Sequence, residues 1–188
     1  MIKLYQQITS QTPEGDKTLD HRAAQRMPWR SFREIYPDGK VFHVVESGLY
    51  ATLDKITYAL FVDGLESYYT GLDPLFPTLR MDDDRLPPKE QIWGINLTGE
   101  QVAYARSFLE QNPLHKTMIG DKPVLVAWFP KYETLGVFSR VVDGRVVEID
   151  EVDVHGNTSA GRLERLPQYP HVLWMIWSHW FPSTKVMV

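Results

Sequence analysis

The sequence predicts an α+β protein: an antiparallel or mixed sheet with packed helices and a Trp-rich C-terminal helix, in a single domain. Short β-branched runs separated by turn residues fill much of 91–149, which is typical of antiparallel strands. Two stretches with helical spacing of aromatic residues flank them, at 28–36 and 171–181. With 188 residues, 43% of them hydrophobic and 23% charged, the chain is long enough to bury a sizeable core.

The N-terminal part of the chain divides at Pro28. Positions 1–27 are polar and weakly patterned, so we expect a polar N-terminal arm there and one α+β domain over 28–188. After Pro28, which suits the first turn of a helix, aromatic residues recur with helical spacing at Trp29, Phe32 and Tyr36. The pattern predicts a helix that ends before the turn residues at 37–39.

The region from 40 to 90 is less regular. A strand is expected over 40–46, and positions 48–70 fit either a helix or a hairpin, with the helix favoured by their Leu, Ala and Lys content. Positions 71–90 are rich in proline, so a long surface loop is expected. Its acidic run, 82–84, is typical of a solvated loop, because calcium loops space their ligands alternately.

Positions 91–182 supply the sheet and the last helix. The expected elements are, in order, a strand over Gln91–Leu97, a helix over Glu100–Gln111, strands over 115–119 and 123–129, a hairpin of 136–142 with 145–149, a connector over 162–167, and a helix from near His171 to Pro182. The hairpin is the clearest of these signals, because Asp143-Gly144 separates two β-branched runs.

The last helix is predicted to be apolar around nearly its whole circumference. Its apolar residues are Leu173, Trp174, Met175, Ile176, Trp177, Trp180 and Phe181. A helix of this kind is buried in a core or covered by a partner, so a homo-oligomer or a protein partner fits the sequence, with Trp180 as a candidate interface residue. His171 and His179 fall roughly on one side of it, where histidines bind metal or haem or make hydrogen bonds at helix ends.

The segment Leu173–Met187 repeats the frame of Pro28–Phe42. The corresponding pairs are Trp29 and Trp174, Phe32 and Trp177, Ile35 and Trp180, Tyr36 and Phe181, Pro37 and Pro182, and Lys40-Val41 and Lys185-Val186. Both copies therefore predict the same helix–Pro–strand unit. The first copy carries Arg30, Ser31, Arg33 and Glu34 on its open face, so it is expected at the surface.

With this repeat, the chain resembles family 3179 of bacterial and archaeal domains of unknown function. The matching stretches, in the family's order, are WRSFREIYPDGKVF, DDDRLPPKEQIWGINLTGEQVAYA, IGDKPVLVAWFPKYETLGVFSRVVDGR and GRLERLPQYPHVLWMIWSHWFPSTKVM. The resemblance implies a repeated module closed by a Trp-rich helix and its tail, so the first copy here is the tail of one module and the second closes a whole one. It also implies that 84–89, DRLPPK, is a shared structural element with an internal ion pair.

The chain departs from this family at one motif. Many members carry Tyr-Cys-Pro-x-Cys after the strand that corresponds to Pro123–Ala127, and here Phe129 and Tyr132 stand where the two cysteines would be. Thiol or metal chemistry suggested by that cysteine pair therefore does not transfer to this chain. The resemblance implies no activity either, since the family has none assigned.

Composition excludes several classes of protein. The net charge is −4 and the sequence has no Lys/Arg run, so we expect no nucleic-acid partner. There is no cysteine, hence no disulfide and no thiolate metal site. The N-terminus lacks a signal-peptide core and the most apolar run is too short to cross a bilayer, so no membrane insertion is expected and the cytoplasm is the default location.

One metal site is a candidate. Glu151, Asp153 and His155 are spaced so that a strand would place all three on one face, where two carboxylates and an imidazole could hold a divalent ion. A solvated strand edge explains the same pattern, with Val152 and Val154 pointing inward.

Ligand or interface candidates lie around the 123–129 strand. Trp128, Phe129 and Tyr132 could line an aromatic pocket, form an interface or pack in the core. Arg140 could bind an anion, or pair with Glu133, Glu148 or Asp150.

No phosphate-binding loop, nucleophile elbow or zinc-protease motif is present in the sequence. The leading hypothesis is therefore a non-catalytic binding or assembly module. The alternatives are a metal-dependent enzyme built on 151–155 and a small-ligand binder with an aromatic pocket. The sequence identifies no cofactor and does not decide whether the protein is an enzyme.

Overall fold

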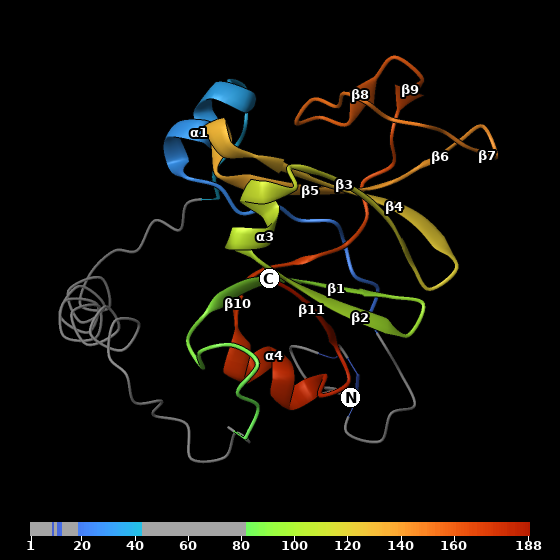
Figure 1. The fold of residues 1–188 in the computed structure, drawn as a ribbon. Helices are drawn as coiled ribbons and strands as arrows, with labels where there is room; N and C mark the ends of the chain where they lie inside the picture. The colour runs from blue at the N-terminus through green and yellow to red at the C-terminus, as the bar shows by residue number, and fades with distance from the viewer. Residues whose placement is uncertain (1–8, 10, 13–18, 43–81) are drawn as a thin grey trace, which may run out of the picture.

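The computed structural model describes residues 9, 11–12, 19–42 and 82–188 (Figure 1). The helix or hairpin expected over 48–70 lies outside the described residues, as do most of the strand expected over 40–46 and of the loop expected over 71–90. In the described ranges the fold is α+β, as predicted, with sheets dominating over helices.

A four-stranded mixed sheet contains β1 (Gln91–Leu97), β2 (Glu100–Ala105), β10 (Tyr169–Leu173) and β11 (Lys185–Met187), in the order β10-β1-β2-β11. The strands pair antiparallel, except that β11 runs parallel to β2. The helix expected over Glu100–Gln111 is wrong in its first half, and only α3 (Arg106–Gln111) is helical. Thr98 and Gly99 have φ values of 50° and 84°, so they form a tight two-residue turn that folds 100–105 back onto β1.

A second, antiparallel sheet contains β3 (Leu114–Ile119), β4 (Lys122–Phe129) and β5 (Thr134–Ser139), with the 3₁₀ turn η1 (Pro130–Tyr132) joining β4 to β5. The hairpin at Asp143-Gly144 is confirmed, but its strands β6 (Val141–Val142) and β7 (Arg145–Val146) are shorter than predicted. A further small hairpin pairs β8 (Asn157–Thr158) with β9 (Gly161–Arg162).

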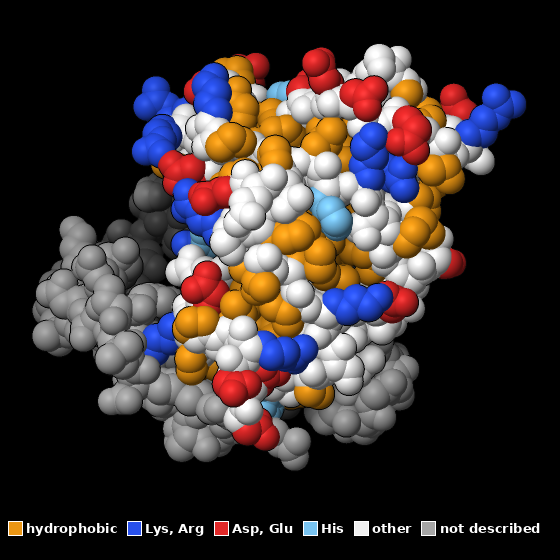
Figure 2. All heavy atoms as spheres, viewed as in Figure 1, with side chains coloured by type: hydrophobic (Ala, Val, Ile, Leu, Met, Phe, Trp, Pro, Cys, Tyr) orange, Lys and Arg blue, Asp and Glu red, His pale blue; other side chains and the backbone are white. Residues whose placement is uncertain are grey.

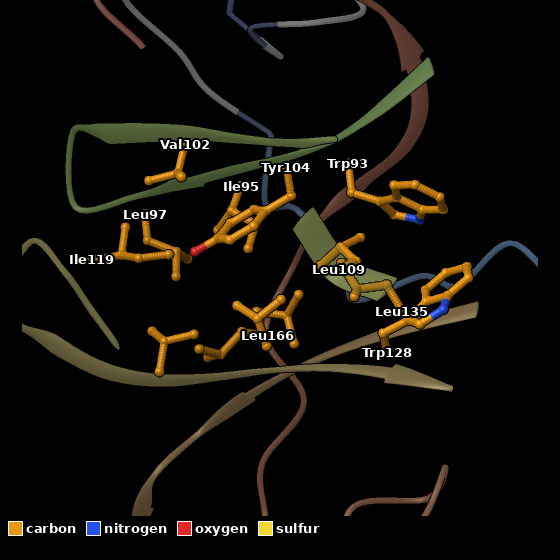
Figure 3. Close-up of a cluster of buried hydrophobic side chains, with 13 residues drawn as sticks. Trp93, Ile95, Leu97, Val102, Tyr104, Leu109, Ile119, Trp128, Leu135 and Leu166 are labelled. Carbon is orange, nitrogen blue, oxygen red and sulfur yellow. The ribbon is translucent and has the colours of Figure 1, made fainter. Parts of the chain in front are cut away.

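The main core lies between the two large sheets (Figure 3). Strand alternation selects its members: Val124, Val126 and Trp128 of β4 point into it, whereas Leu125 and Ala127 point to a second cluster on the opposite face. The buried side chains of the main core are Trp93, Ile95, Leu97, Val102, Tyr104, Leu109, Ile119, Val124, Val126, Trp128, Leu135, Val137 and Leu166.

The outer face of the four-stranded sheet is covered by α4 (Trp174–Trp180), which lies on the side away from the second sheet (Figure 1). Trp174 and Trp177 are fully buried there against Ile92 and Ala103. The predicted start of this helix near His171 is wrong, because β10 continues to Leu173. His171 lies in a β-bulge of β10 with φ of 57°, a backbone conformation that a helix excludes.

The sequence repeat is also a structural repeat. α1 (Trp29–Ile35) and α4 each have seven residues, and the residues that follow them, Tyr36 and Phe181, have nearly the same dihedral angles, φ −127° and ψ 71° against φ −130° and ψ 66°. Their environments differ, because Trp174 is fully buried whereas its counterpart Trp29 is 57% exposed. The first copy is therefore at the surface, as predicted, but Ser31, which was expected on its open face, is only 2% exposed.

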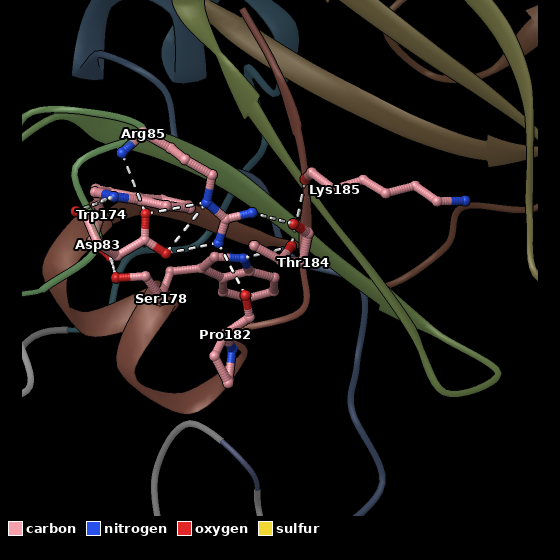
Figure 4. Close-up of polar contacts among 8 residues, drawn as sticks. Asp83, Arg85, Trp174, Ser178, Pro182, Thr184 and Lys185 are labelled. Atoms are coloured by element: carbon pink, nitrogen blue, oxygen red, sulfur yellow. Dashed lines mark hydrogen bonds and ion pairs between the residues drawn. The ribbon is translucent and has the colours of Figure 1, made fainter.

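Arg85 fixes the tail of the second copy to the loop before β1 (Figure 4). Its guanidinium group binds both carboxylate oxygens of Asp83 and donates to the carbonyl oxygens of Thr184 at 2.7 Å and Pro182 at 2.9 Å. It also lies 5.1 Å from the centre of the Trp174 ring. Arg85 thus forms its ion pair with Asp83, which lies just outside the 84–89 element for which the family resemblance implies an internal pair.

A substitution at Gly94 tests how tightly α4 packs on β1. A Cβ atom at this position would lie 2.3 Å from a ring carbon of Trp177, so Gly94→Ala must push α4 away from β1. We expect a loss of about 1–3 kcal/mol in the free energy of unfolding, measured by urea denaturation. Gln91→Ala, at an exposed position of the same strand, should stay within about 0.5 kcal/mol of wild type. If the unfolding free energy of Gly94→Ala equals that of wild type, α4 can move away from β1 without loss of stability, which would contradict this prediction.

The ion pair between Asp83 and Arg85 can be tested by the pH dependence of stability. The hydrogen bond from Arg85 lowers the pKa of Asp83 below its ordinary value of 3.8. The stabilisation is therefore complete above that value and is lost as the pH falls through the lowered pKa. We expect the stability difference between wild type and Asp83→Asn to be constant near neutral pH and to shrink in acid. A difference independent of pH would contradict this, and Asp82→Asn, its exposed neighbour, is the control.

Candidate functional site

The segment 23–27 is fastened to the edge of the second sheet. Thr134 donates its hydroxyl to the carbonyl oxygen of Arg26 at 2.8 Å, and Gln25 donates its side-chain amide to the carbonyl oxygen of Leu135 at 3.1 Å. Gln168 donates to the carbonyl oxygen of Ala24, also at 3.1 Å. These bonds hold the last residues of the expected N-terminal arm in place before α1 begins.

The polar side of α1 faces η1. Glu34 forms an ion pair with Lys131 and accepts a hydrogen bond from the Tyr132 hydroxyl, while Arg30 pairs with Glu133. The hydrogen bond from Lys131 lowers the pKa of Glu34. On the face drawn in Figure 2, Lys and Arg side chains are likewise interspersed with Asp and Glu. Because these charges are engaged at η1, the aromatic side of α1 points elsewhere.

That aromatic side forms a row of four rings. Trp29 and Phe32 are stacked with centroids 5.4 Å apart, and Phe32 and Tyr36 follow at 5.5 Å. Tyr36 then meets the ring of His155 edge-on at 5.5 Å. The i, i+3 and i+7 spacing of Trp29, Phe32 and Tyr36 produces the first two contacts, and the turn after Asp153 supplies the fourth ring.

A hollow of about 680 Å³ opens beside this row. It is lined by Ala23, Gln25, Arg26, Met27, Trp29, Phe32, Tyr36, Lys40, Val41, Phe42 and Arg165. Three of these side chains are cationic, four are aromatic and none is a carboxylate. We call this the α1 hollow. Its lining is positive although the whole chain carries a net charge of −4.

Arg165 is the most constrained cation of the α1 hollow. Its backbone bridges to Phe138, and its guanidinium group lies 4.8 Å from the centre of the Phe138 ring. One terminal nitrogen, Nη2, donates to the carbonyl oxygen of Val154 at 2.6 Å, whereas the other, Nη1, is buried and has no hydrogen-bond partner among the described residues. Burial lowers the pKa of this guanidinium, but an arginine side chain keeps its charge at neutral pH.

The structure changes the geometry of the predicted metal site. Positions 151–155 form an irregular segment and a turn, not the expected strand. The Asp153 carboxylate accepts hydrogen bonds from the backbone amides of His155 at 2.9 Å and Asn157 at 2.8 Å, and from the Asn157 side chain. In the described ranges, no group of three or more His, Asp or Glu side chains is placed so that it could hold a metal ion.

The predicted aromatic cluster is divided between two faces of β4. Trp128 is 4% exposed and lies in the main core, whereas the next residue, Phe129, packs on the opposite face with Phe138. Tyr132, on η1, lies beside Glu34 of α1. These three side chains therefore do not line one pocket, because successive side chains of a strand point in opposite directions.

The remaining predicted site residues, Arg140 and Trp180, are not among the residues that line the α1 hollow. Arg140 pairs with Glu148 at 3.4 Å, one of the three partners expected, while Glu133 pairs with Arg30 and Asp150 with Lys116. Trp180 lies on α4 and is 39% exposed.

Sequence reasoning missed the cations of the α1 hollow. Arg26 and Lys40 flank the helix of the first repeat, so their position beside an exposed aromatic face was a usable signal. Arg165 had no such signal, since its position depends on the pairing of 164–166 with 137–139, which are far from it in the sequence.

The described residues define a sheet-dominated α+β protein with a cationic, aromatic-lined hollow beside α1. The chain belongs to the family described as "Protein of unknown function (DUF3179)", whose match covers residues 2–184. No curated protein and no solved structure matches it. None of the described helices is both long and apolar enough to cross a membrane.

Proposed function

We propose that the protein is a non-catalytic binding module whose α1 hollow takes a small organic anion with a flat apolar body. One observation carries the proposal: the described residues that line the hollow include three cations and four aromatic rings, and none of them is a carboxylate. The proposed small-ligand pocket therefore lies beside α1, in place of the Trp128 and Tyr132 positions that the sequence suggested.

The charge of the ligand follows from the cations. Lys40 and Arg26 have exposed side chains at the edge of the hollow, so they act at longer range and are screened by salt. Arg165 is half-buried, and its unpartnered Nη1 has donors that a carboxylate or a similar oxyanion would accept. A neutral or cationic ligand would leave these donors unused, so an anion is favoured.

The body of the ligand follows from the aromatic rings. Trp29, Phe32 and Tyr36 present ring surface along one wall, and Phe42, which is 92% exposed, extends the apolar surface. Flat apolar groups gain both buried area and ring contacts on such a wall. The volume of about 680 Å³ lies within the range of about 300–1,000 Å³ that holds small organic ligands.

A matched pair of ligands tests the proposal. We expect 2-naphthoate to bind saturably, measured by calorimetry, and its neutral isostere 2-naphthamide to bind at least tenfold more weakly, because a charge-assisted hydrogen bond contributes about 1.5–3 kcal/mol. Arg165→Gln should remove this preference. Arg145→Gln, in the exposed β6–β7 hairpin, is the control and should leave both affinities unchanged.

The fold of each variant is checked by its unfolding free energy, since Arg165 also contacts Val154. Lys40→Gln changes an exposed side chain of the same hollow and should weaken naphthoate binding without loss of stability. Equal binding of naphthoate and naphthamide, or a preference that survives Arg165→Gln, would refute the proposal.

Assembly through α4 is the second candidate, supported by the 39% exposure of Trp180 on a helix whose neighbours Trp174 and Trp177 are buried. We expect Trp180→Ala to abolish self-association in sedimentation velocity while the unfolding free energy is retained. Trp29→Ala, which removes an exposed ring on α1, is the matched control. A wild-type chain that sediments as a monomer at all concentrations would eliminate this candidate.

A further inference from the structure

A cluster of three rings closes one end of the main core. Trp93 of β1 and Trp128 of β4 meet at a centroid distance of 5.2 Å and an interplanar angle of 69°, together at one end of the side chains drawn in Figure 3. The ring of His171, from the bulge of β10, meets Trp93 edge-on at 4.6 Å. We call Trp93, Trp128 and His171 the ring cluster. Strands from both large sheets therefore contribute to it.

Three buried polar atoms of the ring cluster are unpartnered in the described part of the chain. The indole nitrogens of Trp93 and Trp128 and Nδ1 of His171 are buried without a hydrogen-bond partner among the described residues. An indole N–H only donates, and burying one without an acceptor costs about 1–3 kcal/mol. Six buried side-chain atoms are unpartnered in the described residues, and three of them fall in this cluster, so a shared cause is indicated.

Two positive charges, those of Arg106 and Arg26, act on the ring cluster. The guanidinium group of Arg106 lies 5.7 Å from the centre of the Trp128 ring. Burial, together with the charges of Arg26 and Arg106, lowers the pKa of His171 to about 4, so its imidazole is neutral at neutral pH. The carboxylate of Glu110 is bound to Arg106 at 2.6 Å on the exposed side of α3. The surroundings thus favour a negatively charged acceptor.

We propose that the ring cluster binds one small monovalent anion, chloride or a carboxylate of the size of formate, through the indole N–H groups of Trp93 and Trp128. A neutral His171 with its proton on Nδ1 supplies a third donor to the same anion. Arg106 and Arg26 compensate the buried negative charge at longer range. A halide ion and a small carboxylate are both compact and can both accept hydrogen bonds from several N–H groups. The site would recognise this shared property.

This site goes beyond the α1 hollow. Its donors are buried and uncharged, whereas the hollow is open and presents charged groups; Arg26 contributes to both. In the hollow, a ligand with a large aromatic body would contact the faces of aromatic rings. In the ring cluster, the anion would contact only the edges of buried rings. The two proposals therefore fail or succeed independently.

The indole N–H signals of the full chain test this inference by two-dimensional ¹H–¹⁵N NMR. We expect titration with sodium chloride, and separately with sodium formate, to shift the Trp93 and Trp128 signals saturably, at ionic strength held constant with sodium gluconate. The N–H groups of Trp174 and Trp177 already donate, to Asp83 at 3.3 Å and to Thr184 at 3.0 Å, so their signals should stay in place. Trp93→Phe and Trp128→Phe assign the two signals.

A charge variant keeps the test valid if the tryptophan variants fail to fold. Arg106→Gln changes an exposed side chain and should weaken the binding of the anion at least fivefold. Arg145→Gln should leave this affinity unchanged. Saturation by chloride alone or by formate alone supports the site and identifies its ligand. Shifts that grow linearly with salt, or that affect Trp174 and Trp177 equally, would overturn the inference.

Discussion

The close contact between Trp177 and Gly94 is the constraint on which the outer layer of the protein depends. The indole ring of Trp177 fills the space that a side chain on β1 would occupy, and its N–H donates to the Thr184 hydroxyl at 3.0 Å. One side chain therefore joins α4 to the sheet and to the segment leading into β11. Arg85 secures the same segment from outside by binding the carbonyl oxygens of Pro182 and Thr184. Together these contacts bring β11 to its parallel position beside β2.

The two copies of the helix–Pro–strand unit show how one local structure serves two purposes. Both helices have the same length and end in the same backbone conformation, because the local sequence pattern is the same. In the second copy the aromatic face packs on β1 and β2 and becomes core. In the first copy the equivalent face is partly exposed and lines the α1 hollow instead. What surrounds the unit, and not the unit itself, makes its rings structural or available to a ligand.

Both candidate sites concentrate positive charge or N–H donors in an acidic chain. The ion pairs of α1 with η1 use the carboxylates of Glu34 and Glu133. None of the described residues that line the α1 hollow is acidic, although Asp153 acts on Arg165 from outside the lining. Near the ring cluster, Arg106 and Arg26 lie beside buried donors. Local potential, more than net charge, thus decides which ligands such a surface attracts.

The sequence by itself determined the α+β class, the family, the strands at 91–97 and around 123–129, the hairpin at Asp143-Gly144 and the existence of the repeat, because these depend on local periodicity and turn chemistry. It misjudged Glu100–Ala105, whose alternation is short and whose strand character depends on pairing with β1. Only the tertiary structure decided which residues meet. Asp153 satisfies a turn, Trp128 and Phe129 separate across β4, and Arg165 reaches α1 through a bridge to Phe138, since contacts between distant segments are set by sheet pairing and packing.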